Sequence, residues 1–172
     1  PTNPCPPFGT DGHFRTKDGL NLRYARWVEK DDKSRGTVCI FTGRGEFLEK
    51  YYEVISELRR RKFSVAIFDW RYQGGSDCGI RKNKKGVVNN FKKYDNDLRD
   101  FMKEIVLPHC PPPYIGLGHS MGGTLLLRNL IRSDTFFSRS VLSAPMIGIY
   151  GIDGNTWQNI IKNVLHIFCF LG

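Results

Sequence analysis

The run Gly118-His119-Ser120-Met121-Gly122-Gly123 contains the residues of this chain whose types and spacing best suit covalent chemistry. It matches the pattern G-x-S-x-G, the nucleophile elbow, in which a serine lies on a strained turn from a strand into a helix. A serine in that position can attack a carbonyl carbon and form an acyl-enzyme. Glycines two residues to either side leave room where side chains would collide with the neighbouring strand or helix. We therefore predict that Ser120 is a nucleophile.

The helix predicted to follow Ser120 can stabilise the charge that this chemistry creates. Attack on a carbonyl gives a tetrahedral intermediate with an oxyanion, and the free N–H groups at a helix start favour negative charge. A backbone donor in this position contributes about 3 kcal/mol to the stability of such an intermediate. We therefore expect the Met121 N–H to be one oxyanion donor.

Apolar runs bounded by turn residues predict the strands that must position this turn. Residues 37–41 and 64–68 are short, nearly continuous apolar runs, typical of strands buried on both faces. Residues 114–118 and 140–143 give two further strands. Apolar and polar residues alternate over residues 13–15 and 20–28, on either side of a turn at Lys17-Asp18-Gly19. This pattern predicts an antiparallel hairpin at the sheet edge.

Helices are predicted between these strands from apolar residues at three- and four-residue steps. They cover about residues 47–61, 94–106 and 121–131, with Pro108 and residues 111–113 expected to end the second helix. The alternation of strands and helices implies a mostly parallel sheet with right-handed crossovers. Ser120 then lies on a turn between a strand and a helix, as the motif requires.

With this context, the chain resembles the α/β-hydrolase superfamily. Within it the elbow is similar to that of the lysophospholipase and monoacylglycerol-lipase branch (serine aminopeptidase S33-like), which commonly has G-H-S-M-G-G. Three further stretches support the branch. Residues 42–46 (TGRGE) resemble its H-G-x-x-E oxyanion loop, residues 69–76 (DWRYQGGS) its D-x-R-G-x-G-x-S loop, and residues 143–145 its S-A-P segment. Thr42 replaces a histidine and Tyr72 a small residue, so packing of the second loop is open.

The resemblance implies an α/β-hydrolase fold with helices on both faces of a mostly parallel sheet and an N-terminal antiparallel hairpin. Residues 1–145 would be the N-terminal part of the core, and residues 146–172 the start of a lid or cap. The residue after the first glycine of the oxyanion loop gives the second donor, which here is the Arg44 N–H. The implied substrate is a lipid ester, a lysophospholipid or a monoacylglycerol, and no cofactor or metal is needed.

Several residues near the elbow are expected to support it. Gly43, Gly118, Gly122 and Gly123 belong to the two motifs. Glu46 fits a structural role in the first helical turn better than direct catalysis. Asp69 precedes the serine, whereas the family's acid follows it, so we expect Asp69 to organise a turn. His119 is adjacent to Ser120 along a strand and should face the other way, into the core, rather than act as the base.

The partners of a serine triad are expected outside the chain. The family order is serine, then Asp or Glu, then His. The residues after Ser120 include Asp134, Asp153 and His166, none of which is placed as a partner should be; His166 fits a surface position. By the resemblance, the late strands and most of the lid are missing, the base and acid lie beyond Gly172, and the chain alone should show little turnover.

The stretch 156–171 has apolar residues at helical spacing and predicts an amphipathic helix. Its apolar run is too short and too interrupted to span a bilayer. The resemblance makes it part of a lid whose apolar face borders the acyl-chain pocket. An ordinary core helix fits the pattern as well, and both interpretations stay open.

The net charge of +9 is concentrated at residues 59–62 and 81–85. The first run closes a predicted helix, where cations are favoured, and the second fits a solvated loop. Peripheral contact with an anionic membrane is the alternative. No nucleic-acid reader motif accompanies the charge, so we expect no nucleic-acid partner. The oligomeric state cannot be predicted.

Five widely spaced cysteines, an odd number without a C-x-x-C pair, suggest neither a disulfide framework nor a zinc site. A reducing, cytoplasmic setting fits best.

Three functional hypotheses therefore stand. The first is a serine ester hydrolase of single-chain lipids. The second is a degenerate, non-catalytic hydrolase fold that binds a lipid or a partner. The third and weakest is a basic adaptor at a membrane surface.

Overall fold

A six-stranded mixed sheet forms the centre of the computed structural model, which describes residues 3–29, 34–77, 90–132 and 134–147. The strands are ordered β1-β2-β4-β3-β5-β6 across the sheet. Their bounds are β1 Thr10–Arg15, β2 Asn21–Trp27, β3 Thr37–Phe41, β4 Ser64–Phe68, β5 Tyr114–His119 and β6 Arg139–Ser143. Strands β4, β3, β5 and β6 run parallel, whereas β1 and β2 form an antiparallel hairpin at one edge. The predicted strands and the edge hairpin are confirmed.

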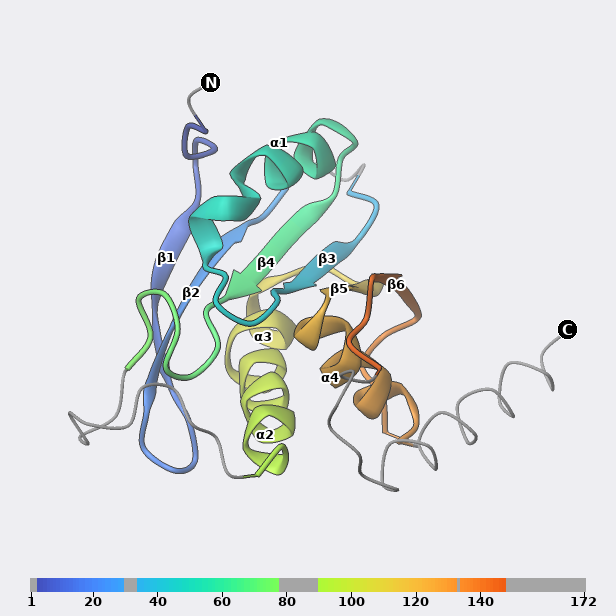
Figure 1. The fold of residues 1–172 in the computed structure, drawn as a ribbon. Helices are drawn as coiled ribbons and strands as arrows, with labels where there is room; N and C mark the ends of the chain where they lie inside the picture. The colour runs from blue at the N-terminus through green and yellow to red at the C-terminus, as the bar shows by residue number, and fades with distance from the viewer. Residues whose placement is uncertain (1–2, 30–33, 78–89, 133, 148–172) are drawn as a thin grey trace, which may run out of the picture.

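Helices cover both faces of this sheet (Figure 1). One face carries a 3₁₀ turn η1 (Leu48–Tyr51) and helix α1 (Tyr52–Arg60). The other carries α2 (Lys92–Phe101), a π-helical turn η2 (Met102–Val106), α3 (Leu107–His109) and α4 (Met121–Leu130). An apolar core lies on each face of the sheet, and successive residues of β3 point into opposite cores. Val38 and Ile40 pack under α1, whereas Cys39 and Phe41 pack toward α2 and α4.

The second helix differs from the prediction at its end. Pro108 does not end the helical run, which continues through α3 to His109. The reason is the π-helical turn η2, after which Pro108 lies in the first turn of α3. The N–H of Leu107 donates to the Met102 carbonyl, five residues back, so the i→i−4 pattern is already interrupted just before Pro108, which has no N–H to donate.

Helix α1 ends in a Schellman motif that is closed by a lysine. The Phe63 N–H donates to the Leu58 carbonyl (3.1 Å), and the Lys62 N–H donates to the Arg59 carbonyl (2.8 Å). Lys62 has φ +66°, a conformation usually left to glycine.

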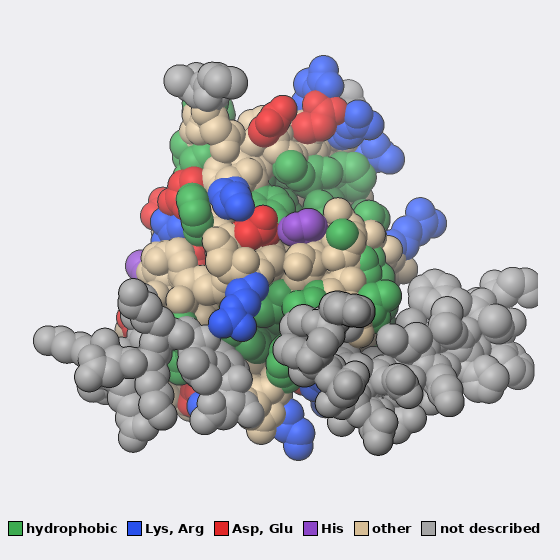
Figure 2. Space-filling model, viewed as in Figure 1, with side chains coloured by type: hydrophobic (Ala, Val, Ile, Leu, Met, Phe, Trp, Pro, Cys, Tyr) green, Lys and Arg blue, Asp and Glu red, His purple; other side chains and the backbone are tan. Residues whose placement is uncertain are grey.

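The basic run at the end of α1 lies among acidic side chains. Arg60 and Arg61 both pair with Glu57, at 2.6 and 2.7 Å, and Arg59 contacts Glu29 at 3.4 Å. Figure 2 shows basic and acidic side chains together over α1. The run at residues 59–62 lies at the C-terminal end of α1, as predicted, and these ion pairs hold it there. The second run, 81–85, and the predicted helix at 156–171 lie outside the described residues.

Candidate active site

Ser120 lies on the turn that joins β5 to α4, in a strained backbone conformation. Its φ of +50° and ψ of −117° are unusual for a residue other than glycine. Its N–H donates to the Ser143 carbonyl (3.0 Å), and its carbonyl accepts from the Met146 N–H (3.0 Å). The last residue of β6 and the segment that follows it therefore bond the backbone of the serine at both its N–H and its carbonyl.

Two of the elbow glycines are required by the close approach of the backbone. A Cβ at Gly122 would lie 2.1 Å from the carbonyl oxygen of Phe41. A Cβ at Gly118 would lie 2.7 Å from the Cα of Gly123. At Gly123 the nearest atom would be the Cβ of Pro145, at 3.0 Å, so that contact is less severe. The elbow helix can thus pack directly on β3.

The start of α4 faces the serine with its positive end. Met121 is the first residue of α4, so its N–H has no acceptor within the helix. No acidic residue occupies the first turn to neutralise the helix dipole. This geometry suits a developing oxyanion beside Ser120.

The loop at residues 42–46 packs against the serine. A Cβ built on Gly43 would lie 3.2 Å from the Cβ of Ser120. The Gly43 N–H donates to Glu46 Oε2 (2.7 Å), and the Gly45 N–H donates to Gln73 Oε1. Among the described residues, no acceptor pairs with the N–H of Arg44, which lies between them.

Glu46 is tied into the same loop. Its Oε2 also accepts from the Tyr51 hydroxyl (2.7 Å), and its Oε1 lies 3.3 Å from the Lys50 Nζ. Burial acts to raise the pKa of Glu46, but the hydrogen bonds from Tyr51 and Gly43 outweigh it and lower that pKa. Burial and the Glu46 carboxylate together raise the pKa of Tyr51. Glu46 is therefore an anion that anchors the loop.

Thr42 replaces the family's histidine and is fully buried. Its carbonyl accepts from the Trp70 indole N–H at 2.9 Å. Its hydroxyl Oγ1 is buried and finds no partner in the described part of the chain.

Asp69 joins three segments of the fold. It is fully buried, and its carboxylate accepts from the Leu48 N–H (2.8 Å), the Gly75 N–H (2.8 Å) and the Arg23 Nε (2.7 Å). Arg23 also forms a bidentate pair with Glu49, at 2.6 and 2.8 Å. Arg23 was missed by sequence reasoning, because nothing in the hairpin pattern distinguishes it.

The loop after β4, residues 69–76, contains two residues with positive φ. Tyr72, at the position of the family's small residue, has φ +66°, and Gly74 has φ +53°. The Tyr72 N–H still donates to the Asp77 carbonyl at 3.2 Å. The tyrosine therefore accepts a left-handed conformation that glycine would adopt without strain.

Arg71 of this loop forms a buried ion pair. Its guanidinium contacts Asp97 at 2.7 and 2.5 Å and Asp18 at 2.9 and 3.1 Å. Burial raises the pKa of Asp97 to about 6 although Arg71 opposes it, whereas hydrogen bonding to Arg71 lowers the pKa of Asp18 to about 2. The network joins the loop to α2 and to the hairpin turn.

His119, the last residue of β5, is less buried than expected. The side chain is half-buried rather than fully buried in the core. The strand ends at His119 and the chain turns sharply at Ser120, so alternation along β5 does not predict which face its side chain occupies.

Within the described residues, the Ser120 hydroxyl has no hydrogen-bond partner. Asp134 pairs instead with Arg99 (2.6 Å) and Arg132 (3.3 Å). Asp153 and His166 lie outside the described residues. The described side chains include no group of His, Cys, Asp or Glu able to hold a metal ion. In the same part of the chain, no helix is long and apolar enough to cross a bilayer.

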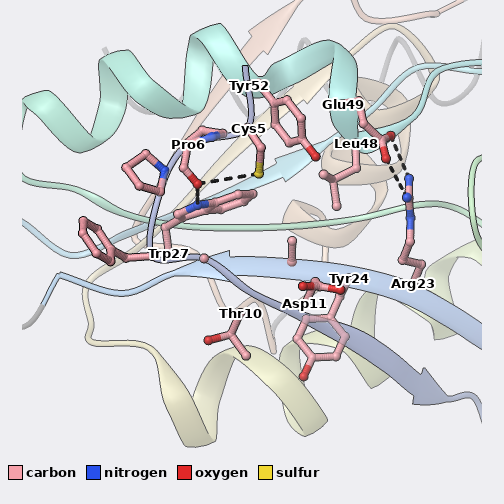
Figure 3. A pocket seen from close by; sticks show the side chains of 14 residues that line it. Cys5, Pro6, Thr10, Asp11, Arg23, Tyr24, Trp27, Leu48, Glu49 and Tyr52 are labelled. Carbon is pink, nitrogen blue, oxygen red and sulfur yellow. Dashed lines mark hydrogen bonds and ion pairs between the residues drawn. The ribbon is translucent and has the colours of Figure 1, made fainter. Parts of the chain in front are cut away.

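A cavity of about 510 Å³ lies beside the hairpin, between the N-terminal segment, β2 and η1. Figure 3 shows the Arg23–Glu49 pair at one end and Trp27 at the other, with the Trp27 indole donating to the Pro6 carbonyl (2.9 Å). None of its lining residues belongs to the elbow or to the loop at 42–46. This cavity is therefore separate from the serine.

The mostly parallel sheet, the strand-turn-helix at Ser120 and the loops that flank it define an α/β-hydrolase fold. Solved structures agree. A soluble variant of monoglyceride lipase from Saccharomyces cerevisiae, in complex with a substrate analogue, has a TM-score of 0.68 at 22% identity, covering 93% of this chain and 50% of that chain. The α/β-hydrolase GrgF from Penicillium has a TM-score of 0.68 at 20% identity, and the match covers 92% of this chain and 53% of that chain.

The chain belongs to the serine aminopeptidase S33 (Hydrolase_4) family, whose model matches residues 32–169. Lysophospholipase L2 of Escherichia coli is 33% identical over 140 residues, 81% of this chain and 40% of that protein. Monoglyceride lipase of Rattus norvegicus is 26% identical over 141 residues, which are 82% of this chain and 45% of that protein. The chain thus spans less than half the length of these relatives, and the resemblance predicted from its motifs is confirmed.

Proposed function

We propose that this chain carries the nucleophile and both oxyanion donors of a serine hydrolase that cleaves carboxylic esters of single-chain lipids. Ser120 attacks the ester carbonyl, and the Met121 and Arg44 N–H groups bind the oxyanion. Collapse of this tetrahedral intermediate breaks the ester C–O bond, releases the alcohol and leaves the acyl group on Ser120. Water then hydrolyses the acyl-enzyme, which releases the fatty acid and restores the serine hydroxyl. The observation that carries the proposal is Ser120 at φ +50° between β5 and α4, with the loop at 42–46 packed against it.

The substrate class rests on the relatives. The names of lysophospholipase L2 and monoglyceride lipase give their substrates as a lysophospholipid and a monoacylglycerol. Both substrates are esters with one acyl chain, so one elbow and one oxyanion hole serve either. We propose a lipid monoester and leave the head group open between them.

The proposed mechanism needs a base that the described residues do not bring to Ser120. We propose that the base and acid come from sequence beyond Gly172, so that residues 1–172 alone turn over little substrate. A serine without its base loses most of its nucleophilicity. The matched comparison is residues 1–172 against the product of the complete gene.

The experiment measures fatty-acid release from a lysophospholipid and from a monoacylglycerol by the product of the complete gene. We expect hydrolysis of at least one, and a loss of at least about 10³-fold in kcat in Ser120→Ala. Ser138→Ala, at a hydroxyl that donates to the Tyr114 carbonyl, is the matched control and should keep activity. Unchanged hydrolysis in Ser120→Ala would contradict the proposal. No hydrolysis, together with binding of the intact lipid, would favour the non-catalytic alternative.

A further inference from the structure

Consecutive backbone N–H groups of the loop beside Ser120 differ in their partners. The N–H of Gly43 donates to Glu46, and the N–H of Gly45 donates to the side-chain oxygen of Gln73. The N–H of Arg44, between them, has no acceptor among the described residues. The two held groups flank the peptide unit that carries the Arg44 N–H, so they position the Cα atoms at both of its ends and restrict how that planar unit can reorient.

Little else holds this part of the loop. Arg44 and Gly45 are exposed, and a Cβ built on Gly45 would meet no atom within 4 Å. Gly45 also has φ +74°, a conformation open to a flexible glycine. Packing therefore does not fix Gly45, and the hydrogen bond from its N–H to Gln73 is the contact that does.

Gln73 is itself held firmly. Its N–H donates to the Trp70 carbonyl (3.0 Å), and its carbonyl accepts from the Ser76 N–H (3.1 Å). Its side-chain Nε2 is buried without a partner among the described residues. Turning the amide over would set its NH₂ against the Gly45 N–H, donor against donor, so Gly45 determines its orientation.

We propose that Gln73 is a positioning residue, which holds the loop at 43–45 so that the Arg44 N–H stays directed at the oxyanion. This rests on the function proposed above. Gln73 does not touch the reacting atoms. It acts through Gly45 from the loop after β4. The loop at residues 69–76 therefore supports the oxyanion hole without contacting the substrate.

The first test needs no turnover. Amide hydrogen exchange, followed by NMR on the product of the complete gene, should give slow exchange at Gly43 and Gly45 and fast exchange at Arg44. Gln73→Met, which keeps the length but removes the acceptor, should speed exchange at Gly45 about tenfold or more. Gln73→Glu keeps an acceptor oxygen and should keep Gly45 protected. Exchange at Gly45 as fast as at Arg44 in the unaltered protein would overturn the proposal, whether or not Gln73→Met folds.

The second test is kinetic. Gln73→Met should lower kcat about tenfold or more with KM changed less than about twofold, since a misdirected donor weakens binding of the transition state rather than of the substrate. Gln73→Glu should recover part of that loss. An unchanged kcat in Gln73→Met, in a protein that Ser120→Ala inactivates, would refute the positioning role alone. If Ser120→Ala were fully active, the proposed function would fail while the exchange result still decided the role of Gln73.

Discussion

At the scale of single residues, the chemistry of the elbow depends on places where only a small residue fits. Ser120 takes a positive φ, which costs free energy and persists because the surrounding hydrogen bonds enforce it. The missing side chain of Gly122 lets α4 approach the carbonyl oxygen of Phe41. Strain and close packing thus expose the serine at the start of a helix.

Gly122→Ala should destabilise the protein by about 2–3 kcal/mol, since the new Cβ would lie 2.1 Å from a backbone oxygen that cannot move aside. Urea unfolding measures the change. Gly123→Ala is the matched control, because it lies in the same helix with its nearest contact at 3.0 Å and should cost clearly less. Equal losses in the two variants would argue against the close approach.

At the scale of elements, loops that follow parallel strands are tied to one another by a few polar side chains. Asp69, at the end of β4, bonds the start of η1 and, through Arg23, strand β2. Glu46 and Gln73 tie down the loop after β3. These contacts act together with the buried side chains of Trp70 and Leu48 to set the positions of the loops around Ser120.

The end of α1 offers a test of an element boundary. Lys62 has φ +66° in the Schellman motif, so Lys62→Gly should be more stable than Lys62→Ala by about 1 kcal/mol. Both variants remove the same side chain, so the difference isolates the backbone conformation. The measurement is the urea midpoint of the pair; an alanine variant as stable as the glycine variant would count against the assignment.

Most elements were predictable, because their apolar spacing and bounding turns are local signals. Residues 37–41 and 64–68 form strands as predicted, and the hairpin lies at the edge. The π-helical turn before Pro108 was not predictable, since apolar spacing does not distinguish a single π-helical turn from the α-helix around it. Partners such as Arg23 and Gln73 were equally hidden, because the bonds they make join segments 46 and 28 residues apart. The motif located the site, and the fold supplied the groups that hold it.

At the scale of the whole molecule, carboxylates with altered pKa values link stability to pH. Hydrogen bonds to Arg71 lower the pKa of Asp18 from 3.8 to about 2, and those to Arg23 lower the pKa of Glu49 below 4.5. Glu46 is lowered as well. Burial instead raises the pKa of Asp97 to about 6. The two groups of carboxylates act on stability in opposite directions.

We expect the free energy of unfolding to fall as the pH drops from about 4.5 toward 2. In that window the unfolded chain binds more protons than the native state at Asp18, Glu46 and Glu49, so the stability that their lowered pKa values provide is lost. Asp97 opposes this at higher pH, since its contribution is present below 3.8 and lost as the pH rises through 6. Urea unfolding at a series of pH values measures the curve. Stability that kept rising to pH 2 would contradict the ion-pair network.

The central claim is that Ser120 is the nucleophile, and covalent labelling tests it most directly. The product of the complete gene is treated with a fluorophosphonate, digested, and analysed by mass spectrometry for the modified peptide. The account predicts one adduct, on Ser120, which is lost in Ser120→Ala. It also predicts that residues 1–172 alone label far more slowly. An adduct on another serine, or labelling that persists in Ser120→Ala, would contradict the account.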